Sequence, residues 1–460
     1  MTSRQCIAVI DIGKTNAKLA LVDLAGLREV AVRRTPNRPK EGPPYPHHDH
    51  ERLKAFILES LAALGRDFAV DAISVTAHGA TVALLDSHGD LALPILDYEH
   101  DGPDTLANDY DAVRPAFAET GSPRLPGGLN AGAQLFWQMR TFPEAFELVR
   151  SIVTYPQYWS GWLTGVPANE VTSLGAHTDL WNFGDRRFSS LVERMGWLGR
   201  MAPLRQATER LGFLRDDISR KIGLERPVPV YCGIHDSNAS LYPHLVTRKP
   251  PFSVVTTGTW VIAMALGGLP VELDPDRDTL VNIDAHGDAV RSARFMGGRE
   301  FERLCPERCP EPGEAELAHV LDRKIMLLPS IQAGTGPFPH HRSRWIGDPD
   351  RLTTPERKAA VSAYLAMMTA TCLSLIGAQG PTVLEGPFAG NAAFRRVLGT
   401  ATGRRVIYME EGTTGTSLGA ALLTDPARLD APPAETEIEP IPDRRTLSYI
   451  ADWQAACSSG

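Results

Sequence analysis

Two apolar runs near the start of the chain are separated by a short polar segment. Residues 7–10 and 19–22 have the length and composition of buried strands, and residues 11–16 between them are polar. The pattern predicts a β-hairpin with a polar tip. Asp, Gly, Asn and Thr are also common turn residues, so a plain strand-connecting turn explains the same segment.

The predicted tip carries chemistry that suits a phosphate group. A carboxylate such as Asp11 at the end of a buried strand is costly unless a cation uses it, and Gly13 lets backbone N–H groups approach an anion closely. Thr15, Asn16 and Lys18 add a hydroxyl, an amide and an ammonium. Together these groups favour a metal-bound polyphosphate.

The rest of the first half alternates between strand and helix patterns. After a Pro/Gly-rich loop at 36–45, we expect a helix from about residue 51 to 65 and strands at 72–76, 82–85 and 91–96. The order strand, strand, helix, strand, strand predicts a mixed sheet covered by helices. A further helix is expected over 134–150, and His47, His48 and His50 are expected in a solvated loop.

Polar residues follow several of these strands and are candidates for binding a ligand. They are His78 and Gly79, the acidic segment 97–101 with Glu99 and Asp101, and Glu170. A packing histidine and a solvated loop are the alternatives for the first two groups. A strand at 228–230 leads into 232–240, where Asp236 lies at a predicted helix start. An N-cap role would also explain Asp236.

The second half opens as the first did. A strand at 252–255 leads into Thr256-Thr-Gly-Thr259 and a second apolar run at 260–265, which predicts a second hairpin. Further along we expect a helix at 357–378, strands at 382–384 and 406–409, and helices over 392–403 and 415–423. Because the two halves share their opening element, the sequence points to a duplicated fold.

Composition limits the classes of function. The chain has 460 residues, 43% of them apolar, and a formal net charge of −8, which argues against nucleic acid or an anionic membrane as the main partner. We expect a cytoplasmic protein, because the first predicted strand leaves no room for a signal peptide and the six cysteines are scattered. Ser and Thr interrupt the apolar run 357–378, which favours a buried core helix over a membrane span.

Four segments in this order resemble the motifs of the FGGY carbohydrate kinases. Asp11-Ile-Gly-Lys-Thr-Asn matches the first phosphate motif and Thr256-Thr-Gly-Thr the second, while Gly386-Pro-Phe-Ala-Gly-Asn391 matches the adenosine motif and Gly-Ile-His-Asp236 the segment of the catalytic base. The resemblance implies an α/β fold with two ribonuclease-H-like domains of the actin/hexokinase type around a central cleft. Their expected bounds are 1–246, with the sugar site and the first phosphate hairpin, and 247–460, with the nucleotide site.

The resemblance also implies roles for individual residues, with ATP and Mg²⁺ as cofactors. Asp236 would be the catalytic base and Asp11 would hold the metal, mostly through water. The phosphate groups would be bound by Gly13, Thr15, Asn16, Lys18, Thr257, Gly258 and Thr259, and the adenosine by Gly386, Gly390 and Asn391. The sugar would be bound by His78, Gly79, Glu99, Asp101, Glu170, His235 and Trp260.

Within the family, the chain is most similar to kinases of the 6-deoxy-ketoses L-rhamnulose and L-fuculose. The similarity lies in the His235-Asp236 pair, Thr257–Trp260 and Glu170, whereas 97–101 and Glu385 depart from the usual motifs. We expect conversion of L-rhamnulose to L-rhamnulose 1-phosphate, with L-fuculose or another ketose or polyol as the alternative substrate. A non-catalytic ATP-dependent switch, a degenerate kinase acting as a regulator, and assembly as a homodimer remain open.

Overall fold

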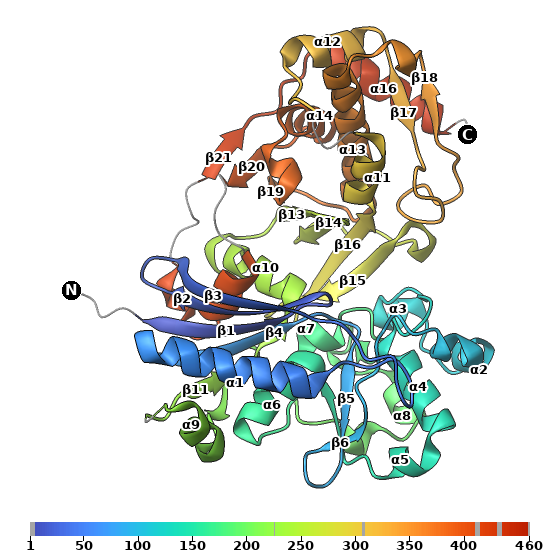
Figure 1. Cartoon of the computed structure of the whole chain (residues 1–460). Helices are drawn as coiled ribbons and strands as arrows, with labels where there is room; N and C mark the ends of the chain where they lie inside the picture. Colours follow the sequence, from blue (N-terminus) through green and yellow to red (C-terminus); the bar gives the residue numbers. More distant parts are fainter. Residues whose placement is uncertain (1–4, 225, 306–308, 410–414, 430–434, 459–460) are drawn as a thin grey trace. The chain divides into compact units, whose positions relative to one another are not determined.

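The computed structural model describes residues 5–458 except 225, 306–308, 410–414 and 430–434 (Figure 1). The chain divides into two compact units. Unit 1 contains residues 1–247, 281–289 and 412–432, and unit 2 contains 248–280, 290–411 and 433–460. The first long segment of unit 1 ends at Thr247, next to the expected boundary, but two later segments also pack with unit 1. The functional division of the chain at 246/247 stays a prediction.

Unit 1 is built on a mixed sheet that begins with the predicted hairpin. Its strands lie in the order β10-β11-β4-β1-β2-β3, with β12 also paired to β4. β1 (Cys6–Ile12) is antiparallel to β2 (Asn16–Asp23) and parallel to β4 (Ala72–Ala77), and β3 (Arg28–Pro36) is antiparallel to β2. The other strands of this sheet are β10 (Arg210–Phe213), β11 (Pro229–Tyr231) and β12 (Ile234–His235).

Helices cover both faces of this sheet, as the period of two in β1 requires. Ala8, Ile10 and Ile12 belong to one core with α1 (His50–Asp67) and α6 (Tyr155–Thr164). Ile7 and Val9 belong to another core with α10 (Asp236–Thr247) and α15 (Gly415–Leu422). The continuous apolar run of β1 is therefore the mark of a central strand that is buried on both faces.

Unit 2 repeats this arrangement, which accounts for the similar openings of the two halves. Its sheet has the order β15-β16-β14-β13-β19-β20-β21. β13 (Phe252–Thr257) is antiparallel to β14 (Val261–Leu266) and parallel to β19 (Thr382–Glu385), as β1 is to β2 and β4. The remaining strands of this sheet are β15 (Thr279–Ile283), of which residues 281–283 are grouped with unit 1, β16 (Ala289–Phe295), β20 (Val406–Met409) and β21 (Glu435–Ile438). The predicted α/β fold with a repeated sheet is confirmed.

The core of unit 2 is packed around α13 (Thr354–Leu375), which lies against α14 (Ala392–Thr402). α13 is long and apolar enough to cross a membrane by length and composition, but 78% of its most apolar window is buried inside the protein. The expectation of a core helix is confirmed. The other helices of unit 2 are α11 (Gly297–Leu304), α12 (Glu314–Asp322) and α16 (Arg444–Ser458). β17 (Met326–Leu328) pairs antiparallel with β18 (Arg344–Ile346).

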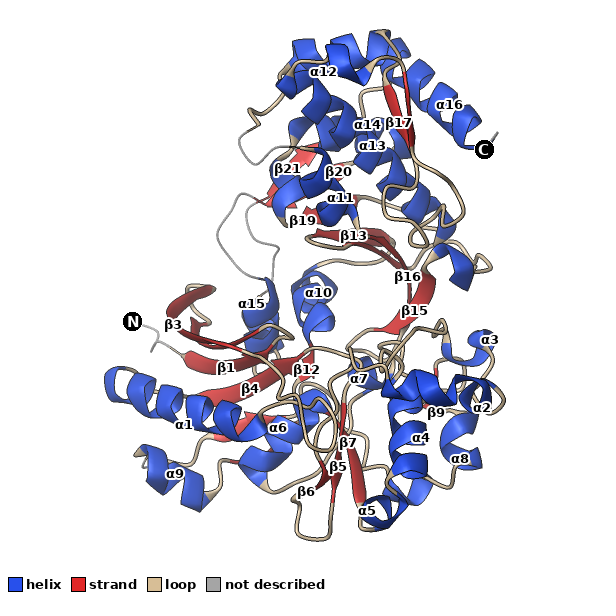
Figure 2. Ribbon diagram, turned by 45° about the vertical axis from the view of Figure 1, so that its right-hand side comes forward, coloured by secondary structure: helices blue, strands red, loops and turns tan. Residues whose placement is uncertain are grey.

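Much of the rest of unit 1 consists of short elements that lie between β4 and β10 in the sequence, many of which are labelled in Figure 2. They include the helices α2 (Ala107–Asp111), α3 (Phe117–Thr120), α4 (Ala131–Thr141), α5 (Pro143–Glu147), α7 (Val171–Leu174) and α8 (Ser190–Arg194), and α9 (Asp216–Ile222) follows β10. The strands among them are β5 (Val82–Leu85), β6 (Leu91–Leu93), β7 (Ser151–Thr154), β8 (Trp181–Asn182) and β9 (Arg187–Phe188).

The structure corrects three expectations. The edge strand β3 was not predicted, because most of its side chains are polar and partly exposed. The single helix expected over 134–150 is two helices, since Pro143 cannot donate the backbone bond that would continue α4. His48 does not lie in a solvated loop: it is 1% exposed and packs against His78 and Tyr155.

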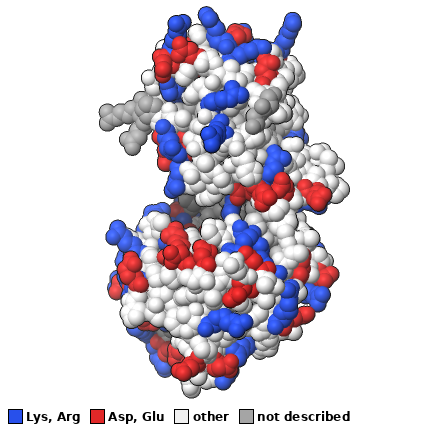
Figure 3. All heavy atoms as spheres, turned by 90° about the vertical axis from the view of Figure 1, so that its right-hand side faces the viewer, with Lys and Arg blue, Asp and Glu red and all other residues white. Residues whose placement is uncertain are grey.

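Basic and acidic side chains are interspersed on the face that Figure 3 shows. The mixture agrees with the modest net charge. The expected cytoplasmic location and the expected absence of nucleic-acid and membrane partners stay predictions.

Candidate functional site

Asp11 lies near the end of β1 in unit 1, where β1 runs between β2 and β4. Burial raises its pKa from 3.8 to about 6; the ammonium of Lys18 opposes this rise, and the charge of Asp236 adds to it. The Nζ atom of Lys18 lies 3.6 Å from Asp11 Oδ2 and also pairs with Glu29. Unit 1 therefore brings Asp11 and Asp236 within electrostatic reach of each other, although 225 positions separate them in the sequence.

Gly13 holds the tip of the first hairpin closed. Its N–H donates to the carbonyl of Asn16 at 3.0 Å, and its carbonyl accepts a bond from Asn37 Nδ2 at 2.8 Å. A β-carbon at position 13 would lie only 3.0 Å from the Asn16 carbonyl oxygen, so Gly fits best here. Thr15 and Asn16 are exposed at the same tip. The tip is compact and polar, as expected.

His235 and Asp236 form a close pair where β12 meets α10. His235 Nε2 lies 3.1 Å from Asp236 Oδ1, and the backbone N–H of Ser237 donates to the same oxygen at 2.6 Å. Burial lowers the pKa of His235. A β-carbon on Gly79 would lie 2.8 Å from His235 Nε2, so the absence of a side chain at position 79 makes room for the ring.

His78 lies beside this pair at the end of β4, because β12 pairs with β4. Its ring is 6% exposed and packs against His48, Tyr98 and Tyr155 with centroid separations of 4.8–5.3 Å. Burial lowers its pKa to about 4, and the charge of Asp236 works against this shift. His78 is therefore neutral near pH 7, and its buried Nε2 has no hydrogen-bond partner in the described part of the chain.

Glu170 lies inside the protein and caps α7. Its carboxylate accepts bonds from the N–H and hydroxyl of Thr172 and from the N–H of Ser173, and burial raises its pKa to about 7. The Thr172 hydroxyl in turn accepts the backbone N–H of His235 at 3.1 Å. Glu170 thus supports the backbone of the His235–Asp236 pair, and its direct contact with a sugar stays a prediction.

The two acids predicted in segment 97–101 have different surroundings. The side chain of Glu99 is 67% exposed and lies 3.3 Å from the ammonium of Lys14. The side chain of Asp101 is 93% exposed and lies beside His100. Asp97, 4% exposed, is the buried acid of this segment, and it pairs with Lys14.

In unit 2, the second hairpin is joined directly to the turn after β19. The hydroxyl of Thr257 donates to the carbonyl of Glu385 at 2.6 Å and accepts the N–H of Phe388 at 3.1 Å. Gly386 has φ +83°, and a β-carbon there would lie 1.9 Å from the Thr257 carbonyl oxygen. The second phosphate motif and the adenosine motif therefore form one compact corner of unit 2.

The tip of the second hairpin also fits closely against α11. The N–H of Gly258 donates to the carbonyl of Trp260, while the N–H of Arg299 approaches the carbonyl of Thr259 at 3.4 Å. A β-carbon on Gly298 would lie 2.0 Å from the Gly258 carbonyl oxygen. The ring of Trp260 lies under the guanidinium of Arg294 at 5.0 Å.

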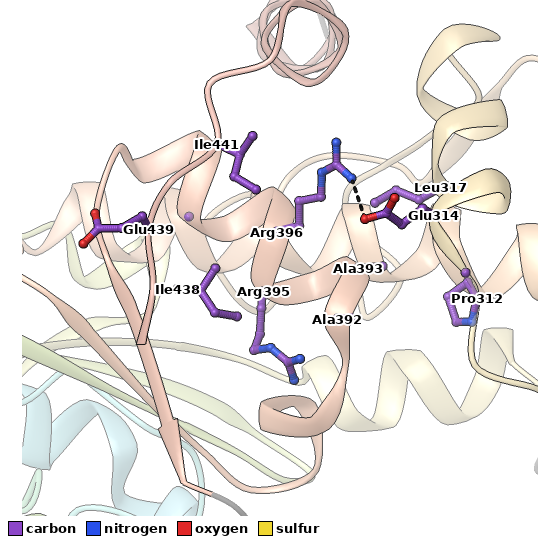
Figure 4. A pocket seen from close by; sticks show the side chains of 12 residues that line it. Pro312, Glu314, Leu317, Ala392, Ala393, Arg395, Arg396, Ile438, Glu439 and Ile441 are labelled. Carbon is purple, nitrogen blue, oxygen red and sulfur yellow. Dashed lines mark ion pairs between the residues drawn. The ribbon is translucent and has the colours of Figure 1, made fainter. Parts of the chain in front are cut away.

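Asn391 and Gly390 end the adenosine motif and lead into α14. Asn391 caps this helix by accepting the N–H of Phe394, and its amide donates to Ser362, whereas Gly390 faces open space. Beyond them an open pocket lies beside α14 (Figure 4). It is lined by Pro312, Gly313, Glu314, Leu317, Ala392, Ala393, Arg395, Arg396, Gly399, Ile438, Glu439 and Ile441.

Several residues of these sites were missed by the sequence analysis. Lys14 was read only as part of a motif, and Thr172, Gly298 and Arg396 were not singled out. Their importance lies in contacts across long sequence separations, such as the 83 positions between Lys14 and Asp97. The strand-end position of the acidic segment was the one available signal for Lys14, because a buried acid needs a cationic partner.

Two family models match the chain. "FGGY family of carbohydrate kinases, N-terminal domain" matches residues 6–242, and "Carbohydrate kinase FGGY, C-terminal domain" matches residues 249–432. Among curated proteins, an L-fuculokinase from Salmonella typhi is 26% identical over 271 residues, and one from Escherichia coli (strain K12) is 26% identical over 277 residues. The alignments span 57% of this chain and 57% and 56%, respectively, of those relatives.

The fold matches solved structures over their whole length. A carbohydrate kinase from Novosphingobium aromaticivorans is 36% identical with a TM-score of 0.91, and the match covers 100% of this chain and 99% of that one. A xylulose kinase from Lactobacillus acidophilus is 16% identical with a TM-score of 0.80, covering 99% and 98% of the two chains; it supports the fold alone.

Proposed function

Because the chain belongs to the FGGY family of carbohydrate kinases, we propose that it transfers the γ-phosphoryl group of ATP to a hydroxyl of a ketose sugar. The observation that carries this proposal is the grouping of Asp11, His78, His235 and Asp236 in unit 1. It combines two carboxylates, for a metal and for a proton, with neutral imidazoles that can bind hydroxyl groups.

Asp236 is the proposed general base. Its side chain is 32% exposed, so it can meet a substrate, and the contacts of Oδ1 with Ser237 and His235 fix its orientation. As the sugar oxygen bonds to the γ-phosphorus, Asp236 takes the hydroxyl proton, and the bond from the γ-phosphorus to the bridging oxygen breaks to leave ADP. Positioning by the neighbouring side chains lowers the entropic part of the barrier.

Asp11 fits the role of a magnesium carboxylate. The described residues hold no group of three His, Cys, Asp or Glu side chains placed to bind a metal ion. Mg²⁺ commonly keeps several waters and binds through one or two carboxylates plus phosphate oxygens, so a single carboxylate such as Asp11 suits it. When bound, Mg²⁺ neutralises charge on the phosphate oxygens. Asp11 would orient it through water, and its buried charge would be compensated.

Unit 2 is the proposed nucleotide domain. The hydroxyl of Thr259 and the backbone N–H groups beside Gly258 are suited to phosphate oxygens, as are the hydroxyl of Thr15 and the N–H groups beside Gly13 in unit 1. The lining of the pocket beside α14 includes Ala392, the residue after Asn391, and has both apolar and charged side chains. We therefore assign the nucleobase to this pocket. Ala392→Trp, at an exposed helix position, should raise the KM for ATP several-fold with little effect on the KM for sugar. Equal effects on both would contradict this assignment.

L-Rhamnulose is the proposed substrate and L-fuculose the nearest competitor. The two relatives named L-fuculokinase support a deoxy-ketose, although this chain aligns with little more than half of their length. His78 and His235, both in unit 1, could bind hydroxyl groups of the sugar. Unpaired polar groups in such a site penalise a missing hydroxyl strongly, whereas a methyl group contributes only ~1–3 kcal/mol.

A panel of sugars tests this proposal by ADP release. We expect kcat/KM to be highest for L-rhamnulose, lower for L-fuculose and poor for glycerol. Higher values for glycerol or D-xylulose would contradict the assigned sugar but leave the kinase activity standing. No ADP release with any ketose would contradict the kinase activity and favour a non-catalytic switch.

A further inference from the structure

The ammonium of Lys14, at the tip of the first hairpin, contacts three successive residues of the loop 97–101. It pairs with the carboxylate of Asp97, lies 3.3 Å from Glu99 Oε2 and lies 4.5 Å from the centre of the Tyr98 ring. The side chain of Lys14 is 15% exposed and that of Asp97 is 6% exposed. The pair is therefore screened from solvent far more than an ordinary surface ion pair.

The same loop also contacts His78. Tyr98 packs edge-to-face on His78 with a centroid separation of 5.3 Å. The carboxylate of Asp97 also accepts the N–H of Glu99 at 3.2 Å, so one oxygen shapes the loop and holds Lys14. A path of direct contacts thus runs from the hairpin tip through Tyr98 to the buried imidazole.

We infer that Lys14 is a positioning residue that couples the nucleotide to the sugar site. A phosphate at the tip beside Gly13 restrains Lys14, and Lys14 restrains the loop 97–101 and, through Tyr98, the ring of His78. The sugar site is then better ordered when nucleotide is present. The inference rests on the proposed function, which places a phosphate at this hairpin.

Burial explains why Lys14 stays on the loop when a phosphate arrives. Removing one partner of a buried ion pair leaves an uncompensated charge on the other, which here would be Asp97. The exposed Glu99 can release the ammonium at little cost. Lys14 can therefore direct part of its charge to the phosphate while it remains paired with Asp97.

Hydrogen exchange of the segment 95–101, with and without Mg²⁺ and the non-hydrolysable analogue AMP-PNP, tests this coupling in the full chain. In the wild type, we expect the nucleotide to slow exchange in this segment by about fivefold or more, the lower end of typical coupling. Lys14→Met and Asp97→Asn should abolish the slowing, and Lys14→Arg should retain it. Lys54→Met, which removes the ion pair with Glu51 on α1, is the matched control and should behave as the wild type.

The double variant Lys14→Met/Asp97→Asn distinguishes a loss of coupling from a general loss of stability. Because it leaves no unpaired buried charge, its Tm should lie closer to that of the wild type than either single variant does. The nucleotide should still fail to slow exchange in 95–101. Nucleotide-dependent slowing in the double variant would overturn the inference.

A separate measurement of AMP-PNP binding distinguishes failure of the coupling from failure of the proposed kinase activity. AMP-PNP that binds the wild type without slowing exchange in 95–101 would overturn the coupling but leave the proposed kinase activity intact. No binding of AMP-PNP to the wild type would overturn both.

Discussion

The carboxyl group of Asp11 is a buried acid of the candidate site whose ionised form is disfavoured by burial. It lies near the end of a central strand, and burial raises its pKa to about 6 despite the nearby ammonium of Lys18. A metal ion would compensate this charge, whereas a purely structural turn would have no use for it. Asp11 is therefore the residue at which the functional and structural interpretations of the first hairpin differ most.

The raised pKa of Asp11 predicts how stability depends on pH without Mg²⁺. A carboxyl group with a raised folded-state pKa stabilises the fold while protonated; this contribution is complete below 3.8 and is lost as the pH rises through about 6. The shift corresponds to roughly 3 kcal/mol. Asp11→Asn, which stays neutral, should therefore gain in Tm relative to the wild type between about pH 4 and pH 7.5. The exposed Asp101→Asn is the control, and a Tm difference that does not change with pH would contradict the prediction.

Removing the carboxylate of Asp11 also tests its proposed metal role. Asp11→Ala should show no measurable ADP release at any Mg²⁺ concentration, because the carboxylate orients the ion as well as attracting it. Titration of Mg²⁺ in a coupled ADP assay measures this. Full recovery at high Mg²⁺ would mean that Asp11 only concentrates the ion.

Among the elements, the corner between β13 and the turn after β19 leaves little room for change. At Gly386, positive φ and the Thr257 carbonyl both exclude a side chain. Gly386→Ala should therefore lower the Tm of unit 2 by several degrees, since both backbone strain and a steric clash result. Gly390→Ala, whose β-carbon would meet nothing within 4 Å, is the control and should leave the Tm unchanged. Calorimetry that finds the same small change for both would contradict this account.

The elements that could be predicted from the sequence are those whose pattern is local. The hairpins β1–β2 and β13–β14 follow from paired apolar runs with polar tips, and α1 follows from its apolar face. β3 was not predicted, because a partly exposed edge strand needs no apolar run. The bounds of unit 1 were not predicted either, because the packing of 281–289 and 412–432 depends on contacts with distant parts of the chain.

The residues of the candidate site also divide into those with a local sequence pattern and those whose role depends on distant contacts. The types of residue at positions 11, 13, 78 and 236 suggested their chemistry, because each lies at or after the end of a buried strand. The burial of His48 and Glu170 and the pair between Lys14 and Asp97 depend on tertiary contacts that have no local pattern. The sequence therefore suggested candidate reacting groups, but not the residues that hold them in place.

For the whole molecule, two units with the same arrangement of strands carry two different kinds of site. Unit 1 has carboxylates and imidazoles at the ends of its strands, whereas unit 2 has Gly-rich turns and a pocket beside a helix. This division agrees with a kinase in which one domain binds the sugar and supplies the base while the other binds most of the nucleotide.

The turnover of Asp236→Asn with ATP, Mg²⁺ and the best ketose of the panel tests the central claim most directly. We expect kcat to fall by ~10²–10⁴, the usual contribution of general acid–base catalysis, while the Kd for AMP-PNP and the Tm stay close to those of the wild type. Ser237→Ala, which keeps the backbone N–H that bonds to Asp236, is the neighbouring control and should lose far less activity. Near-normal turnover in Asp236→Asn would show that Asp236 only begins a helix, and would contradict the proposed mechanism.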